Sequence, residues 1–319
     1  MFCGCKDMKK IKFDTFRQMV LVIILIAMCA VWAIMSPNFL TMNNLMNVVR
    51  QASYTAIASV GMTMVIIIGE IDLSAGSLIA ASGMIAAAVY KSTGNIVLAF
   101  AAAIISGVLV GLFNGVLCAK GKLPGFIATL ASMTILRALG YIITGGDPIS
   151  VMDKTFTALG TGYLGVIPIP VIIMVICIVI GSFIMNKTRF GRYVYAVGGN
   201  AETSKWSGLN VDKVKILVYV FMGVLTSVAG IIVAARLGSG QPSAGQSFEM
   251  DCITAAVVGG TSMAGGKGKI SGTIVGVLLL TVLVNGMTLI DVNSYWQQVI
   301  KGVIIVVSVL MDTRTKKAK

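Results

Sequence analysis

The chain has 319 residues, of which 57% are hydrophobic and 12% are charged, and its mean hydropathy is +0.93. Because a soluble globular domain carries about 25% charged residues, this composition excludes an ordinary soluble protein and predicts a polytopic membrane protein. The net charge of +13 does not indicate a nucleic-acid partner, since in a membrane chain the Lys and Arg residues first set the topology. The absence of histidine excludes imidazole proton relays and His-based metal ligation.

Long apolar runs without alternation, such as residues 20–33, favour helices over a β-barrel, so the expected fold class is all-α. Stretches long enough to cross a hydrocarbon core predict about ten transmembrane helices. They cover residues 19–35, 53–69, 73–90, 96–118, 126–143, 167–185, 214–235, 252–264, 270–289 and 296–311.

The two chain ends are expected to be short basic tails, residues 1–18 and 314–319, on either side of one transmembrane domain at 19–313. The first apolar run is long for a signal peptide and lacks a small-residue cleavage site, so it is interpreted as a helix that stays in the protein. With about ten spans, most of the 25 Lys and Arg residues fall on one side, which predicts that both termini are cytoplasmic.

Two acids interrupt the apolar stretch VIIIGEIDLSAGS at residues 65–77. One helix over residues 53–90 would be about 57 Å long against a core of about 30 Å, so the chain must turn back or break near this stretch. A cytoplasmic turn and an intramembrane break both remain open. Asp72 is expected to cap a helix that starts at Leu73 or Ser74, with a pathway or gating role as the alternative. The candidates at this break are Gly69, Glu70, Asp72, Ser74 and Gly76.

Residues 255–274 repeat this scheme of apolar helix, Gly-rich turn and apolar helix, which predicts two pseudo-repeated halves with short, Gly-broken helices. The candidates here are Gly259, Gly260 and Thr261. The following stretch TSMAGGKGKIS lacks the Gly and the Ser or Thr of a phosphate loop, so no ATPase motif is found in the chain. Rows of small residues, such as Gly107, Gly111 and Gly115, predict close packing inside the bundle rather than dimerisation.

The polar segment 186–215 contains signals for a short helix from Ala201 to Ser207, with Asn200 as N-cap and Gly208 just past the end. Such a segment is either a topological anchor or a docking surface. Because an isolated helix of this length is unstable unless it is docked, the partner surface is the functional alternative. Its candidate residues are Asn200, Ala201, Glu202, Lys205, Trp206 and Gly208.

Two polar, slightly acidic segments, 144–166 and 238–251, are expected on the opposite side as solvated loops or as a docking surface for an external partner. The docking candidates are Asp147, Asp153, Glu249 and Asp251. Arg137 and Lys301 fall inside predicted spans, where ionisable residues are functional by default, although Lys301 is close enough to an aromatic pair to reach the interface.

Five blocks carry a family resemblance: GEIDLSAGS, KGKLPGFIATLASM, the long block from Thr188 to Ile216, the block from Ala235 to Thr273, and SYWQQVIKG. In this order they resemble the permease subunits of ATP-binding-cassette monosaccharide importers, the ribose type above all. The resemblance implies a bacterial inner-membrane permease that pairs with a second permease copy. It also implies two cytoplasmic ATPase subunits or one fused double ATPase, which would hold ATP and Mg²⁺, and an extracytoplasmic sugar-binding protein.

The same resemblance implies that residues 199–212 form the helix through which ATPase closure reaches the membrane, while this chain binds no cofactor of its own. Glu202 and Gly208 match the spacing of the superfamily's coupling loop, but Thr203 and Ser204 stand where that loop has two alanines. The alternatives are an ion-coupled secondary sugar transporter with Glu70 and Asp72 as its ion site, a membrane enzyme or scaffold, and an importer of another pentose, a hexose or a furanosyl signal molecule.

Overall fold

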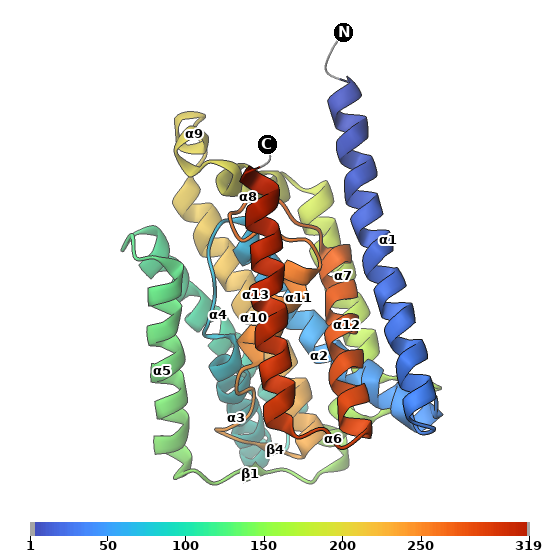
Figure 1. Cartoon of the computed structure of the whole chain (residues 1–319). Coiled ribbons are helices and arrows are strands. Elements are labelled where there is room, and N and C mark those ends of the chain that lie inside the picture. Colours follow the sequence, from blue (N-terminus) through green and yellow to red (C-terminus); the bar gives the residue numbers. More distant parts are fainter. Residues whose placement is uncertain (1–3, 318–319) are drawn as a thin grey trace.

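The computed structural model describes the backbone of residues 4–317 and the side chains of residues 19–310. It is a helical bundle (Figure 1), and the only strands in this part of the chain are two-residue segments. The elements are α1 (Gly4–Met35), α2 (Met42–Ile67), α3 (Ala75–Thr93), α4 (Ile96–Ala119), α5 (Gly125–Thr144), β1 (Ile149–Ser150), α6 (Lys154–Thr161), β2 (Tyr163–Leu164), β3 (Ile167–Pro168), α7 (Ile169–Lys187), α8 (Arg189–Gly199), α9 (Ala201–Trp206), α10 (Val211–Leu237), β4 (Ser239–Gly240), α11 (Phe248–Val258), α12 (Ile270–Leu289) and α13 (Ser294–Lys317).

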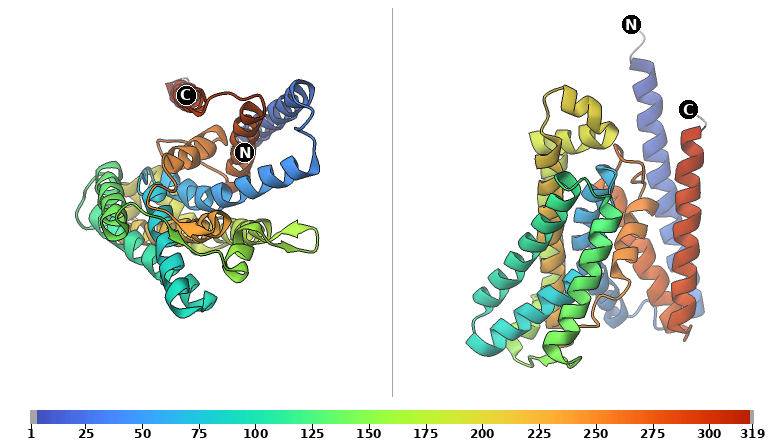
Figure 2. Two further views of the ribbon diagram at one scale, coloured as in Figure 1. Left: turned by 90° about the horizontal axis from the view of Figure 1, so that it is seen from below. Right: turned by 90° about the vertical axis from the view of Figure 1, so that its left-hand side faces the viewer.

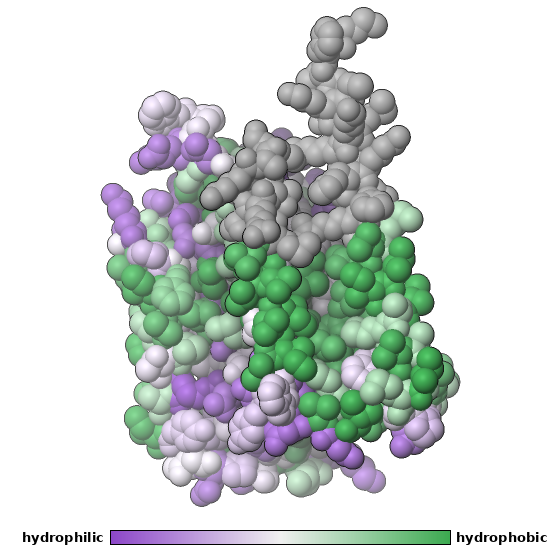
Figure 3. Space-filling model, viewed as in Figure 1, coloured by the Kyte–Doolittle hydropathy of each residue, from purple (hydrophilic) through white to green (hydrophobic). Residues whose placement is uncertain are grey.

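The long helices stand side by side, and the two ends of the bundle differ (Figures 1 and 2). Helices α8 and α9 lie at one end together with the start of α1 and the end of α13; we call this the α9 end. The antiparallel pair of β1 with β4 and helix α6 lie at the other, which we call the β1–β4 end. On the face shown in Figure 3, an apolar band separates hydrophilic residues at the two ends, as expected for a protein that crosses a bilayer.

The start of α4 at Ile96 is as predicted, whereas α3 extends to Thr93, three residues past the predicted end. Gly94 ends α3 with φ of 66°, and Asn95 caps α4, its side-chain oxygen accepting the N–H of Val97 at 2.9 Å. This left-handed glycine followed by an Asn cap explains why the turn between the third and fourth predicted spans was readable from the chain alone.

Each predicted span overlaps a helix, although the bounds differ. Five helices are long and apolar enough to cross a membrane, namely α4, α5, α7, α10 and α12, and shorter apolar stretches cover Met19–Met35 and Ser294–Leu310. The span predicted at 252–264 is too long, since α11 ends at Val258. Helix α1 already begins at Gly4, so most of the segment predicted as a separate N-terminal tail continues the first helix; residues 1–3, 318 and 319 lie outside the described chain.

The core lies around α10 and the second half of α2. From Ile57 to Ile68 the apolar side chains of α2 are buried on every side, which is typical of a helix in the centre of a bundle. Helix α4 packs on α10 through its glycine row: a Cβ added to Gly107 would meet the carbonyl of Gly223, and one added to Gly111 would meet that of Tyr219. The expectation that this row serves internal packing is confirmed.

Candidate functional site

Helix α9 projects from the α9 end as a short capped knob (Figure 1). The side-chain oxygen of Asn200 accepts the N–H of Thr203 at 2.9 Å, and Gly208 has φ of 82°, a conformation that favours glycine. The predicted helix at 201–207 is therefore confirmed, with its last residue at Trp206. This helix could be predicted from the sequence because its N-cap, Asn200, and the glycine that ends it, Gly208, each act on the adjacent turn of the helix.

The outward face of α9 is open. Trp206 has 89% of its surface exposed, and Ala201, Glu202 and Lys205 are exposed as well, whereas Ser204 is buried against the rest of the protein. An exposed aromatic ring on the same short helix as an acid and a base is typical of a partner surface.

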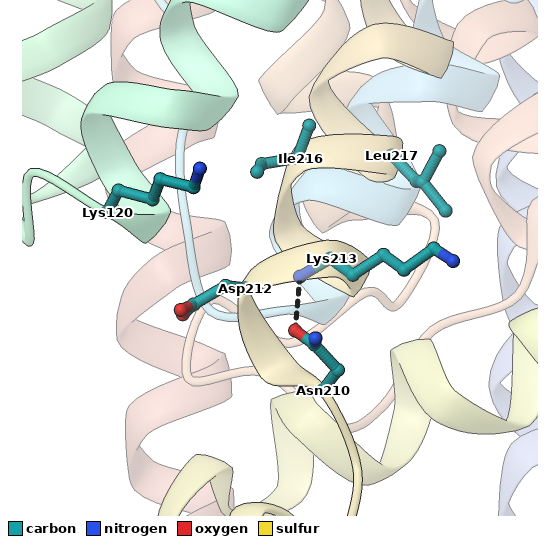
Figure 4. Close-up of a pocket in the computed structure, with 6 residues that line it drawn as sticks. All are labelled: Lys120, Asn210, Asp212, Lys213, Ile216 and Leu217. Carbon is teal, nitrogen blue, oxygen red and sulfur yellow. Dashed lines mark hydrogen bonds between the residues drawn. The ribbon is translucent and has the colours of Figure 1, made fainter.

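A hollow of about 260 Å³ lies beside the knob, between the end of α4 and the start of α10 (Figure 4). It is lined by Lys120, Asn210, Asp212, Lys213, Ile216 and Leu217. Lys120 reaches from α4 toward α10 and Asp212 points toward α4, while the side chain of Lys213 points away. Asn210 caps α10 by accepting the N–H of Lys213 at 2.9 Å, so the rim next to α9 is rigid. Sequence reasoning did not single out this hollow.

The first break is an extended segment, residues 68–74, which leaves α2 at the α9 end and leads into α3. Gly69 starts it with φ of 81°. The Glu70 carboxylate forms an ion pair with Lys215 of α10, with 2.6 Å between Oε1 and Nζ, and its Oε2 accepts the N–H of Gly125 at 2.8 Å. Glu70 therefore ties the segment to α10 and to the first residue of α5.

Deeper in the segment, Asp72 is buried in a polar network. Its Oδ1 accepts the N–H and the hydroxyl of Ser74 at 2.8 and 2.6 Å. Ser74 Oγ accepts Nδ2 of Asn114 at 3.0 Å, and Ser132 donates to the Asn114 oxygen. Helix α3 begins at Ala75 with Ser74 as its N-cap, and no side chain caps it, so the prediction that Asp72 caps a helix from Leu73 or Ser74 was wrong. Asp72 instead stabilises the turn that precedes the helix.

The backbone of the segment runs against the first turn of α5. Thr129 accepts the N–H of Leu73 at 3.0 Å and lies 3.2 Å from the carbonyl of Ile71. Because Glu70 and Leu73 both bond to the first two turns of α5 and Ser74 bonds to Asn114 of α4, the segment is a break held against the bundle rather than a free turn.

The second break, residues 259–269, meets the first. The N–H of Gly266 donates to the carbonyl of Ile67 at 2.8 Å, so the loop after α11 caps the end of α2. A Cβ on Gly198, in α8, would meet the same carbonyl, and Tyr195 donates to the carbonyl of Gly268 at 2.9 Å. Helix α8, which precedes α9, thus contacts the second break and the last residue of α2, after which the first break begins.

Among the predicted residues of the second break, Gly259 packs backbone to backbone on Gly272 of α12, so an added Cβ has no space there. Gly260 has φ of 100°, and Thr261 is buried beside Gly268. Just after the first break, Gly76 is the second residue of α3, where an added Cβ would meet the carboxylate of Glu249 and the carbonyl of Gly245. Close approach of neighbouring atoms explains Gly76 and Gly259, and the positive φ explains Gly260.

The placement of Glu249 and Asp251 in an outer loop was wrong. Both lie in α11, which starts inside the bundle; Glu249 is 8% exposed and Asp251 forms an ion pair with Lys301 of α13, 2.7 Å from Oδ1 to Nζ. The expectation that Lys301 reaches the membrane interface was also wrong, because its ammonium group is paired with Asp251. The polar run before α11 resembles a surface loop in sequence, and only its packing on α3 places it inside.

The other two docking candidates do lie at the β1–β4 end and are exposed. Asp147 stands in the turn before β1, and Asp153 caps α6 by accepting the N–H of Thr155 at 2.7 Å. Tyr90 also donates to Asp153 at 2.6 Å, and these two hydrogen bonds, that from Tyr90 first, hold the pKa of Asp153 below its ordinary value. Asp153 is therefore a structural cap as well as a surface charge.

Within the residues described, no three Cys, Asp or Glu side chains gather closely enough to hold a metal ion. The polar groups of the interior are instead hydroxyls, amides and paired charges. The structure thus combines an exposed helix α9, two breaks that contact the neighbouring helices α8 and α10, and polar segments inside an apolar bundle. Such an arrangement is typical of proteins that move a polar solute or a signal across a membrane.

Comparisons with known proteins agree with this layout. The family described as branched-chain amino acid transport system / permease component matches residues 44–309. The chain is 45% identical to the ribose import permease protein of Escherichia coli (strain K12), with 92% of each chain covered, and 44% identical to that of Haemophilus influenzae, with 91% of each covered. It is 41% identical to that of Bacillus subtilis, with 97% of each covered. No solved structure matches it.

These relatives are named as permeases, and the family match extends over most of the bundle, including both breaks and α9. With its apolar helices, this makes the chain a multi-pass protein of the inner membrane that belongs to the family of transport-system permease components.

Proposed function

We propose that this chain is the membrane-spanning subunit of an ATP-binding-cassette importer whose substrate is a monosaccharide, ribose first among them. The observation that carries the proposal is the 41% to 45% identity with ribose import permeases of three bacteria, along nearly the full length of each chain. The exposed knob at α9 supports the same class, since an importer of this type needs a contact for a separate ATPase.

In this proposal the α9 end faces the cytoplasm and about ten helices cross the membrane, with both termini inside. Basic residues support this orientation, because loops on the cytoplasmic side of a membrane carry an excess of Lys and Arg. Those at the α9 end include Lys120, Lys122, Lys187, Arg189 and Arg192, whereas the β1–β4 end presents the acids Asp147 and Asp153.

Helix α9 is the proposed contact for the ATPase. Trp206 supplies exposed apolar surface, Glu202 and Lys205 flank it, and the hollow beside α10 gives room for a protruding side chain of the partner. ATP and Mg²⁺ belong to that partner in this proposal, as either two ATPase subunits or one fused double ATPase.

The elements on both sides of α9 connect it to the breaks. Helix α8 rests on the end of α2 through Gly198, and α10 holds Glu70 through Lys215. A displacement of α9 would therefore reach the extended segment 68–74 by two routes, and through Glu70 it would reach α5. These contacts support a coupling role for α9 better than a role as a mere topological anchor.

The outer partner is proposed to be an extracytoplasmic sugar-binding protein that docks at the β1–β4 end, where Asp147 and Asp153 are exposed. A second permease copy would complete the passage, and lipid would surround the apolar belt. The ion-coupled alternative is less well supported, because Glu70 is already paired with Lys215 and Asp72 accepts its hydrogen bonds from Ser74.

The test is uptake of labelled ribose by proteoliposomes that hold this chain with its ATPase and its binding protein. We expect uptake that requires ATP and rises with liganded binding protein. A Gly208→Val variant, which forces a β-branched residue to φ of 82°, should lose uptake and remain inserted. Uptake that follows an ion gradient in vesicles lacking the ATPase would contradict the proposed importer class. Preference for a different sugar would contradict only the proposal that the substrate is ribose.

A further inference from the structure

The segment 241–247, QPSAGQS, enters the bundle from the β1–β4 end and climbs along α3 to the start of α11. Its depth follows from backbone contacts: Gly240 packs on Met84, and Gly245 packs on Gly76. At about 1.5 Å per residue, these points lie about 13 Å and about 25 Å from the outer end of α3 at Thr93. The segment therefore runs alongside the inner part of α3, away from the outer end of that helix.

Two features hold the segment in this extended form. Arg137 of α5 donates to the carbonyls of Pro242 and Ala244, at 2.6 and 2.7 Å from its Nη1. On the inner side, Gly245 and Glu249 pack against Gly76, so that the first turns of α3 and of the short helix α11 meet inside the bundle. The segment is thus rigid and is flanked by α3 and α5.

Its outward side is polar and open. Ser243, Gln246 and Ser247 are exposed, and Gln241 is half-buried. In Figure 3, hydrophilic residues gather on the lower part of the face where Figure 1 shows α5 and α13, next to the hydrophilic β1–β4 end. Irregular backbone and amide side chains at this depth cannot face lipid, because hydrocarbon offers them no hydrogen bonds; they must face protein or water.

The charges of the region narrow the choice of solute. Arg137 is the cation beside the segment, and the buried carboxylate of Glu249 lies close enough to interact with it electrostatically. The region as a whole therefore combines opposite charges with neutral hydroxyls and amides. This chemistry favours a neutral, polyhydroxylated solute over an anion or a cation.

We infer that segment 241–247, held by Arg137, is a wall of the solute passage, and that Gln246 and Ser243 hydrogen-bond the hydroxyl groups of a monosaccharide as it crosses. This inference rests on the proposed transport function and adds to it the residues that the sugar meets. The passage side is the one between α5 and α13, and Glu249 acts behind the wall as the counter-charge of Arg137.

The experiment uses the assembled transporter in proteoliposomes, with the native cysteines of this chain replaced and ribose uptake shown to persist. Cysteines are then introduced by Ser243→Cys and Gln246→Cys, and both variants are treated with a water-soluble cationic methanethiosulfonate. We expect both to react and to lose ribose uptake, while ATP hydrolysis persists. The matched control is Val179→Cys, an exposed apolar position in the middle of α7 that should not react because it faces lipid.

A second variant avoids chemical modification. Gln246→Ala should lower ribose uptake by about 2- to 12-fold, the loss expected from one hydrogen bond, and Gln246→Asn should recover part of it. Failure of positions 243 and 246 to react would overturn the inference, since the segment would then be covered by protein. Reaction without loss of uptake would overturn it as well, since the segment would then lie in water but outside the passage. If the untreated transporter does not import ribose at all, the proposed function fails instead.

Discussion

Glu70 and Lys215 form an ion pair of 2.6 Å between the first break and the helix that follows the α9 knob, and both side chains are largely buried. The other oxygen of the same carboxylate holds the first N–H of α5. One side chain thereby contacts three elements, the first break, α10 and the start of α5, so its removal should affect the packing of all three.

Replacing Lys215 with Met should destabilise the protein by about 1–3 kcal/mol, because the Glu70 carboxylate loses a charged hydrogen-bond donor while it remains mostly out of water. The measurement is the midpoint of thermal unfolding in detergent. The exchanged pair, Glu70→Lys with Lys215→Glu, should recover part of the loss. Lys213→Met, whose side chain points away from the hollow, serves as the control and should unfold like the parent.

Gly198 and Gly199 are neighbours with opposite surroundings, and they provide a paired test of the contact between α8 and the breaks. A Cβ on Gly198 would meet the carbonyl of Ile67 and the backbone of Gly266, whereas one on Gly199 would have no atom within 4 Å. We expect Gly198→Ala to cost about 1–3 kcal/mol and to reduce coupled uptake. Gly199→Ala should leave both unchanged. Equal behaviour of the two variants would refute the contact.

Trp206 is exposed in the isolated chain, so its replacement by Ala should leave the unfolding temperature unchanged. If α9 is the ATPase contact, the same variant should lose co-purification with the ATPase, because exposed aromatic residues dominate many interfaces. Trp296→Ala, also well exposed but at the β1–β4 end of α13, is the control and should retain the ATPase. Retention by both variants would remove α9 from the interface.

The packing of α4 on α10 can be tested through glycine. Gly107→Ala places a methyl group against Gly223 and Ser227 and should lower the free energy of unfolding by about 1–3 kcal/mol. Gly302→Ala, in a helix position with no neighbouring atom, should be neutral or should stabilise by about 0.5–1 kcal/mol through helix propensity. Thermal unfolding of both variants checks the difference, and a stable Gly107→Ala protein would disprove the close approach.

Much of the fold follows from local sequence. The apolar runs, the left-handed Gly94, the Asn95 cap and the capped α9 helix each act within a few residues, so the helices and several of their ends were predictable. The need for a break near Glu70 also follows from length alone, because residues 53–90 cannot form one helix across a membrane.

The misplaced residues have a common cause. Glu249 and Asp251 belong to a polar stretch that, taken alone, has the composition of an outer loop, and the contacts that bring it into the bundle join residues far apart in the chain, such as Gly76 and Gly245. The pairing of Asp251 with Lys301 depends on how α11 and α13 pack, which no local pattern encodes.

The sequence by itself determined the membrane class, most helices and the capped knob, since hydrophobic length and capping are properties of single segments. Only the tertiary structure decided where the polar groups lie: Glu70 on Lys215, Asp72 in a network with Ser74 and Asn114, and segment 241–247 beside α3. The physical reason is that buried polar groups must find partners, and those partners are supplied by whichever helices packing brings together.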